Sequence, residues 1–135
     1  MLSRFIYSST RQCTDEVLSQ ILADARDFNA RNDLSGAFYL FGHTFIQYLE
    51  GDDLVIDALW RRIQPDSRHA QCRLLDQRLV MLRLFQGWSM TWLVRTPETD
   101  HLVDLLLPHP TQSDDMNGSL AASLFLALSK AAAHK

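Results

Sequence analysis

The sequence has little cysteine, no long apolar run and no block of like charge, and each absence excludes a class of protein. The 2 cysteines, Cys13 and Cys72, are too few and too isolated from each other for a disulfide framework or a zinc knuckle, so we expect reduced thiols. No apolar stretch approaches the length of a membrane span, and residues 1–7 lack the pattern of a secretory signal. We therefore expect a cytoplasmic protein without membrane attachment.

The charged residues are balanced in number and dispersed along the chain. The 135 residues include 13 Lys and Arg against 16 Asp and Glu, which gives a formal net charge of −3. This balance argues against nucleic acid or an anionic membrane as the main partner. The length and a hydrophobic content of 47% suit one domain with one core. No metal site is predicted, because no partner at metal-ligand spacing accompanies His43, His101, His109 or His134.

Strand and helix patterns alternate in the first half of the sequence. A β-rich run from Leu2 to Ser8 predicts a strand, and Thr14 is placed to cap a helix that ends near Asn29. Two further β-rich runs, Leu34 to Phe41 and Thr44 to Glu50, predict a hairpin. The helix should bury one face, because apolar residues recur along it at helical spacing, namely Leu18, Ile21, Leu22, Ala25 and Phe28.

The second half repeats this order and adds a final pair of strands. A helix is predicted from Gly51 to Ile63, with Pro65 shortly after its end. The β-favouring residues return in two runs, Cys72 to Leu84 and Gly87 to Val94. The order βαββαββ predicts an α/β (α+β) fold of the ferredoxin-like class, with two helices on one face of a mixed, mostly antiparallel sheet.

Residues 96–135 have a different composition from the segment before them. We expect a helix from Glu98 to Leu107, a linker from Pro108 to Asp115 and an Ala/Leu-rich helix from Ser119 to Ala132. The last helix is apolar around much of its circumference, so it should pack on the sheet face that the first two helices leave uncovered. We therefore expect a core of residues 1–95 and a helical extension, 96–135, within the same domain.

One strand carries a polar side chain where the pattern predicts burial. Along a strand side chains alternate, so Phe45, Gln47 and Leu49 share one face while Ile46 and Tyr48 share the other. A buried amide without partners costs several kcal/mol on transfer scales, so something must satisfy Gln47. Its amide both donates and accepts, and rotation exchanges the two roles at little steric cost.

Two further polar residues can converge with Gln47 between the helices and the sheet. Tyr7 shares a face with Phe5 in the first strand, and Asn29 closes the apolar stripe of the first helix. Taken singly, each is more often an ordinary hydrogen-bonded structural residue. Together, a phenol and two amides around an apolar pocket suit a flat heterocycle with both donors and acceptors.

Five short motifs, in order and at the right spacing, make residues 4–92 resemble the BLUF family. They are Tyr7-Ser8-Ser9, Asn29 with Leu34-Ser35-Gly36, Gln47-Tyr48-Leu49-Glu50-Gly51, Arg68-His69 and Trp88-Ser89-Met90. The resemblance implies a blue-light receptor that binds FAD non-covalently and catalyses no reaction on a substrate. It also implies a flavin-binding role for residues 1–95.

The resemblance implies a role for each matched residue. Asn29 would bond the pyrimidine edge of the flavin ring, and Gln47 would reach its N5 and C4 carbonyl. Tyr7 would bond Gln47 and donate an electron to the excited flavin. The other implied flavin neighbours are Ile21, Leu22, Arg62, Ile63, Asp66, Arg68 and His69.

The implied mechanism is a switch of hydrogen bonds. Light-driven transfer of an electron and a proton from Tyr7, followed by their return, would leave Gln47 rotated or tautomerised, with a small red shift of absorption. Trp88, Met90 and Trp92 should alternate onto one face of the last strand, and the resemblance makes Trp88 and Met90 photoactive neighbours of Gln47. Movement of this strand would reach the C-terminal helices and then a separate protein effector, or the protein's own assembly.

Two other functions compete with the sensor. The first is a ferredoxin-like binding or dimerisation module without flavin, because many functions share that fold. The second is a small phosphohydrolase that uses Arg62, Asp66 and His69, although no Ser or Cys nucleophile lies in a recognisable turn. A yellow protein with a flavin spectrum would favour the sensor, colourless protein would favour the module, and phosphatase activity that is lost in His69→Ala would favour the enzyme.

Overall fold

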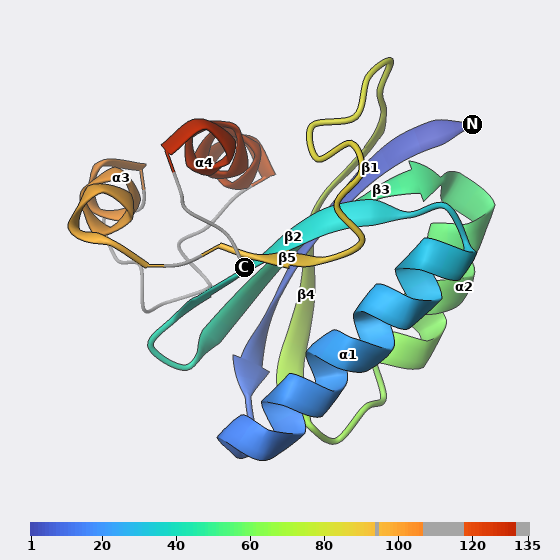
Figure 1. Cartoon of the computed structure of the whole chain (residues 1–135), viewed down its shortest axis with the longest axis horizontal. Coiled ribbons are helices and arrows are strands. Elements are labelled where there is room, and N and C mark those ends of the chain that lie inside the picture. The colour runs from blue at the N-terminus through green and yellow to red at the C-terminus, as the bar shows by residue number, and fades with distance from the viewer. Residues whose placement is uncertain (94, 107–117, 132–135) are drawn as a thin grey trace.

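A five-stranded sheet in the order β4-β1-β3-β2-β5 forms the centre of the protein (Figure 1). The computed structural model describes residues 1–93, 95–106 and 118–131. All neighbouring strands are antiparallel except β2 and β5, which are parallel. The strands are β1 (Leu2–Arg11), β2 (Ser35–Phe41), β3 (Thr44–Asp52), β4 (His69–Leu79) and β5 (Thr91–Trp92).

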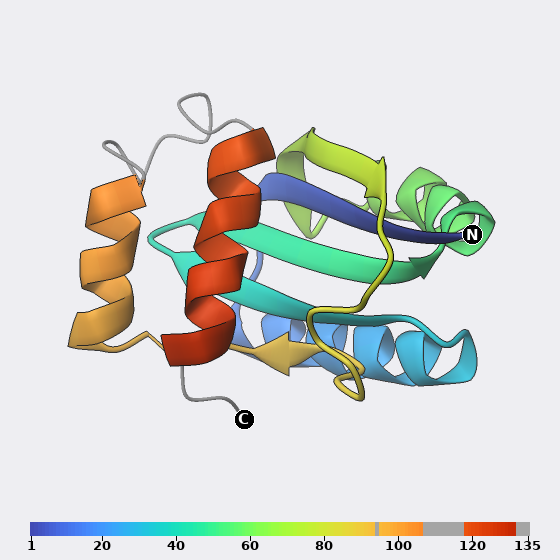
Figure 2. The ribbon, with the colours of Figure 1, turned by 90° about the horizontal axis from the view of Figure 1, so that it is seen from above.

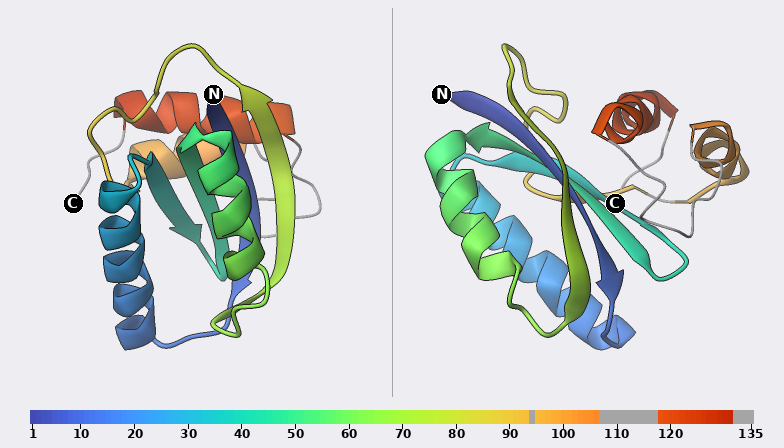
Figure 3. Two further views of the ribbon diagram at one scale, coloured as in Figure 1. Left: turned by 90° about the vertical axis from the view of Figure 1, so that its right-hand side faces the viewer. Right: turned by 180° about the vertical axis from the view of Figure 1, so that it is seen from behind.

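Helices cover both faces of this sheet (Figures 2 and 3). The first two, α1 (Asp15–Arg31) and α2 (Asp53–Ile63), lie on one face, and α4 (Gly118–Ala131) crosses the other, with α3 (Pro97–Leu106) beside it. The predicted α+β fold with a ferredoxin-like βαββαββ order is thus confirmed, as is the packing of the last helix on the second face. The predicted linker from Pro108 to Asp115 lies outside the described residues.

The alternation of side chains divides the apolar residues into two cores. Phe45 and Leu49 of β3 pack toward α1 and α2, whereas Ile46 and Tyr48 pack toward α4. The α4 side of the core includes Phe125, whose ring centroid lies 5.3 Å from that of Tyr48. The predicted two faces of this strand are therefore confirmed.

Local signals fix the start of α1 and the close approach of β2 to β3. The Thr14 hydroxyl accepts a hydrogen bond from the Val17 amide at 3.3 Å, and the acidic Asp15 and Glu16 occupy the first turn. A Cβ on Gly36 would lie 2.1 Å from the Tyr48 carbonyl oxygen, so a larger residue would force the two strands apart.

The two final strand predictions were too long. The strand predicted from Cys72 to Leu84 ends at Leu79, and within the described part of the run from Gly87 to Val94, residues 87–93, the strand is Thr91–Trp92. The Val80 amide still donates to the Leu2 carbonyl at 3.1 Å, but farther on the amides of residues 84 and 85 donate to the carboxylate of Glu50 instead of to a neighbouring strand. This buried carboxylate anchors the chain that follows β4.

Candidate functional site

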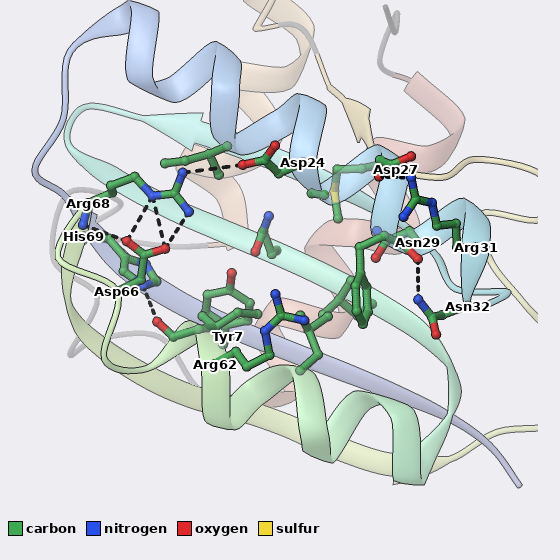
Figure 4. Close-up of a pocket in the computed structure, with 18 residues that line it drawn as sticks. Tyr7, Asp24, Asp27, Asn29, Arg31, Asn32, Arg62, Asp66, Arg68 and His69 are labelled. Atoms are coloured by element: carbon green, nitrogen blue, oxygen red, sulfur yellow. Dashed lines mark hydrogen bonds and ion pairs between the residues drawn. The ribbon is translucent and has the colours of Figure 1, made fainter.

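A cavity of about 520 Å³ lies between α1, α2 and the sheet (Figure 4). This volume is in the range of sites that bind small molecules and cofactors. Side chains from both helices, from β1 and β3 and from the segment before β5 form its wall. The predicted site residues that line it are Tyr7, Ile21, Asn29, Gln47, Arg62, Ile63, Asp66, Arg68, His69 and Met90.

Tyr7 and Gln47 are direct cross-strand neighbours at the base of the cavity. The antiparallel register of β1 and β3 pairs the two residues, which places their side chains on the same face. Tyr7 is 4% exposed and Gln47 is 6% exposed. In the part of the chain that the structure describes, neither the phenol nor the amide has a hydrogen-bond partner, so both are available to a ligand in the cavity.

Burial also determines the protonation of Tyr7. Removal of the phenol from water raises its pKa above the ordinary value, and the nearby Cys72 and Asp66 raise it further. Tyr7 therefore remains a neutral hydrogen-bond donor throughout the physiological pH range. A neutral phenol next to a rotatable amide can either donate to the amide oxygen or accept from its NH2 group.

Asn29 connects the cavity to the segment before β5. It lies near the end of α1, is 1% exposed, and its side-chain nitrogen donates to the Ser89 carbonyl at 2.5 Å. Its backbone carbonyl accepts from the Leu34 amide at 2.9 Å, which fixes the start of β2. The amide of Asn29 is thus held in place at the wall of the cavity.

Trp88 and Met90 lie on different faces of the sheet. Met90 is buried in the wall of the cavity, together with the apolar residues of the α1 and α2 side. Trp88 packs on the α4 side, with its ring centroid 5.4 Å from that of Phe85. The prediction that Trp88 alternates onto one face with Met90 was wrong, because strand β5 begins only at Thr91 and the chain before it is not extended.

Asp66 and Arg68 form a bidentate ion pair at one end of the cavity (Figure 4). The guanidinium donates to both carboxylate oxygens, at 3.0 Å from Nε and 2.6 Å from the terminal nitrogen. These bonds are the main reason that the pKa of Asp66 falls to about 2, and the same pairing raises the pKa of Arg68. Both partners therefore stay charged at physiological pH, and the carboxylate of Asp66 balances the charge of the guanidinium while holding it in place.

The ring of His69 is held from two sides. Its Nε2 lies 2.7 Å from the Ile63 carbonyl oxygen, and its Nδ1 lies 3.0 Å from the Ser9 hydroxyl. Because a carbonyl oxygen only accepts, Nε2 donates in that contact. Cys72 lies behind the ring, with its sulfur 3.4 Å from Nε2. Both contacts orient His69 as part of the cavity wall.

The open side of the cavity is formed by α1 and α2. The guanidinium carbon of Arg62 lies 5.4 Å from the centre of the Phe28 ring, so the two helices approach each other there through a cation–π contact. Leu22, in contrast, is buried beneath α1 and does not line the cavity, so its predicted contact with the ligand is not supported. Its position in the stripe indicated burial, which it has, but could not distinguish core from cavity wall.

Sequence analysis missed several residues of the wall. Some belonged to predicted apolar faces, so alternation and helical spacing could have found them: Ala25, Phe28, Leu49 and Leu59. The others are polar residues of α1 and its C-terminal end, which no motif distinguished from a solvated helix surface, namely Asp24, Asp27, Arg31 and Asn32. Asp24 also lies 3.8 Å from a guanidinium nitrogen of Arg68.

The residues of this site fit a flavin ring. The base supplies the phenol of Tyr7 and the amide of Gln47, which open into the cavity and make no hydrogen bond to the described residues, and the wall supplies the amide of Asn29. Apolar side chains such as Ile21, Leu49 and Ile63 flank them, which suits the two faces of a planar aromatic ring. The donor set therefore matches the edge of a heterocycle that both donates and accepts.

Comparison with known proteins identifies a family. The model of the BLUF family, described as sensors of blue-light using FAD, matches residues 2–91. Subunit beta of the photoactivated adenylate cyclase from Euglena longa is 30% identical to this chain over 113 residues. That match covers 81% of this chain but only 12% of the cyclase subunit, so this chain spans about an eighth of the length of its relative.

Solved structures match over almost the whole chain. The photo-activated state of BlsA has a TM-score of 0.87 and 28% identity, with coverage of 97% of this chain and 96% of that one. BlrB, described as a BLUF protein in its dark state, has a TM-score of 0.69 and 29% identity, with coverage of 90% and 96%. The helices on both faces of the sheet are therefore part of the similarity to BlsA.

Proposed function

This chain belongs to the BLUF family, the sensors of blue light using FAD, and on that premise we propose that Tyr7 and Gln47 are its light-switched pair. FAD, when bound, absorbs blue light and becomes a strong oxidant in its excited state. Tyr7 would give an electron and a proton to that oxidant, and both would then return to the phenol, so that no net oxidation remains. Gln47 finishes in the other orientation of its amide, with donor and acceptor exchanged.

The pairing of β1 with β3 carries this proposal. It places a neutral phenol directly opposite a buried amide, and neither has a competing hydrogen bond among the described residues. An amide fixed by protein partners could not rotate without breaking their bonds, whereas this one exchanges its two ends at little cost. Since the phenol of Tyr7 is kept neutral by burial, its proton is available to leave with the electron.

The remaining wall residues hold the cofactor in this proposal. Asn29 would bond the polar edge of the ring, and Ile21 and Ile63 would form apolar walls beside it. Arg68, fixed by Asp66, and the oriented ring of His69 close one end of the site. Arg62 lies at the open side, next to Phe28, where it can contact the part of the ligand nearest to solvent.

We assign to this chain a sensory role without catalysis of its own. The cyclase subunit of Euglena longa is matched over only 12% of its length, so most of that protein lies outside the similarity. We propose that residues 1–95 form the flavin-binding core and that 96–135 form its helical extension. The signal then passes from the extension to a separate protein effector or changes the assembly of the protein itself.

Absorption spectra of the purified protein test the proposal. We expect a yellow protein with a structured flavin absorption band at about 450 nm, and this band should shift slightly to longer wavelength under blue light. Gln47→Leu should retain FAD and lose the shift, because leucine cannot exchange hydrogen bonds. Gln86→Leu, at an exposed loop position, should behave as the parent. A normal shift in Gln47→Leu would contradict the assigned mechanism.

A further inference from the structure

The segment from Trp88 to Leu93 connects the cavity to the opposite face of the sheet. Met90 lines the cavity, while Trp88 packs against Phe85 on the α4 side. Only two residue pairs, Ala37 with Thr91 and Phe38 with Trp92, join this segment to β2 as a strand. A short edge strand with few backbone pairs opens at a lower free-energy cost than the long central strands of a sheet.

Backbone hydrogen bonds hold the segment on the side of β2. The Gly36 amide donates to the Trp88 carbonyl at 2.9 Å, and the Leu93 amide donates to the Phe38 carbonyl at 2.9 Å. The carbonyls of Ser89 and Met90, between these two points, face α1 instead. The middle of the segment therefore depends on whatever α1 supplies.

Two side chains of α1 bind those two consecutive carbonyls. Asn29 donates to the Ser89 carbonyl at 2.5 Å, and Arg26 donates from Nε to the Met90 carbonyl at 3.0 Å. Residues 26 and 29 are three apart, so they lie on the same side of the helix. Arg26 and Asn29 together form a clasp that fixes the backbone at Met90, whose side chain lines the cavity.

The two members of this clasp differ in their relation to the ligand. Asn29 is buried and lines the cavity, so its amide would face a bound cofactor in addition to donating to the Ser89 carbonyl. Arg26 is an exposed residue outside the cavity wall, and it has no ion pair within the part of the chain that the structure describes. The bond from Arg26 to Met90 is therefore independent of direct contact with the ligand.

We propose that Arg26 is a positioning residue that holds the Met90 backbone in the dark arrangement and so sets how readily the segment 88–93 is released. The proposal rests on the light-switched role of Gln47. Met90 and Gln47 line the same cavity, so an exchange of donor and acceptor at the Gln47 amide changes the polar surroundings that the Met90 segment faces. The backbone of Met90 can follow only when the Arg26 bond opens, and its re-formation returns the segment to the dark arrangement.

The test compares Arg26→Ala, Arg26→Lys and Arg61→Ala in the FAD-loaded full chain. Arg61 is an exposed arginine of α2 outside the cavity wall, so its variant controls for loss of a surface charge. We expect Arg26→Ala to keep the size of the light-induced shift, but its recovery in the dark should slow by about three- to tenfold, since one charge-assisted hydrogen bond is lost. Dark amide exchange of residues 88–93 should rise by a similar factor. Arg26→Lys should change the dark recovery rate and the amide exchange less than Arg26→Ala does, because an ammonium can still donate to the carbonyl.

Two readouts separate this proposal from the proposed function. Dark amide exchange of residues 88–93 needs no photochemistry, so it tests the clasp even in a protein whose spectrum does not respond to light. Exchange and recovery equal to those of Arg61→Ala would overturn the role of Arg26. Loss of FAD or of the shift itself in Arg26→Ala would also overturn it, because the residue would then belong to the binding site. An unresponsive parent spectrum would instead refute the function assigned to Tyr7 and Gln47.

Discussion

At the scale of single residues, Tyr7 illustrates how burial prepares a side chain for electron transfer. Its ring packs among aromatic side chains, with centroids 6.3 Å from Phe5 and 5.0 Å from Trp60. Desolvation raises the pKa of the hydroxyl, so the group stays protonated where an exposed tyrosine would ionise. The ring therefore supplies packing, and the hydroxyl supplies the chemistry.

Tyr7→Phe separates these two contributions. We expect the variant to fold and to keep FAD, because the ring contacts remain, and to lose the light-induced shift, because phenylalanine has no proton to transfer. Tyr39→Phe is the matched control, since Tyr39 lies on the α4 side of the sheet with its hydroxyl 3.2 Å from that of Thr99. Absorption spectra before and after blue illumination provide the measurement. A normal shift in Tyr7→Phe would exclude it as the donor.

Asp66 makes the folding stability of the protein depend on pH in the acid range. Its pKa in the folded protein is lowered to about 2, chiefly by the side-chain hydrogen bonds from Arg68. Between that value and an ordinary value of about 4, the unfolded state binds more protons than the folded state, so stability falls as the pH falls. The contribution is fully present above the unfolded pKa and disappears as pH falls through the folded pKa.

Asp66→Asn should remove that part of the pH dependence. We expect the variant to be less stable than the parent at neutral pH, with the difference narrowing steadily as pH falls from about 4 to about 2. Urea unfolding at several pH values measures it. Asp57→Asn, outside the cavity wall, provides the comparison. A constant difference between parent and Asp66→Asn across this range would mean that the ion pair does not survive in solution.

At the scale of elements, the sequence predicted β1 to β3 and α1 well and β4 and β5 poorly. Alternation correctly placed Phe45 and Leu49 on the same face as Gln47. It succeeded because the strand is extended and buries one face in each of the two cores. The end of β4 could not be predicted in this way. The chain that follows it is anchored by a carboxylate more than 30 residues earlier in sequence, to which the amides of Leu84 and Phe85 donate. Local patterns cannot reveal a long-range contact of this kind.

Glu50 therefore explains part of a motif that sequence analysis associated only with the family. Its carboxylate is fully buried and accepts from the Leu84 amide at 2.6 Å, the Phe85 amide at 2.7 Å and the Ser35 hydroxyl at 2.8 Å. These bonds anchor the connection between β4 and β5 to the strand that carries Gln47. The glutamate thus positions the chain that leads to Met90.

Glu50→Gln should loosen this anchor. A glutamine has one acceptor oxygen, so its NH2 group would face an amide or hydroxyl donor, and we expect a loss of about 2–3 kcal/mol in the free energy of unfolding. Faster amide exchange at residues 84 and 85 should accompany it. Glu98→Gln, at an exposed position of α3, should change the stability little. Equal stability of both variants would contradict the role given to Glu50.

At the scale of the whole molecule, one sheet separates the cavity from the C-terminal helices. Sequence patterns predicted this layering, because α4 is too apolar to remain unpacked. They could not predict that the chain passes from one face to the other between Trp88 and Met90, since alternation presumes an extended strand. The result is a direct route through the edge of the sheet: Met90 contacts the cavity, and Trp88 contacts Phe85, which packs on Phe125 of α4 with centroids 6.3 Å apart.

This layering predicts that light changes the protection of α3 and α4, although neither helix lines the cavity. A change at Gln47 can reach them only by displacing packed side chains, and packed interfaces respond by shifting between discrete arrangements. We therefore expect faster amide exchange under blue light in residues 98–106 and 118–131, with little change in the first turns of α1. In Gln47→Leu the light-dark difference should vanish, which controls for heating by the lamp. Identical protection of α3 and α4 in both conditions would show that the signal leaves by another surface.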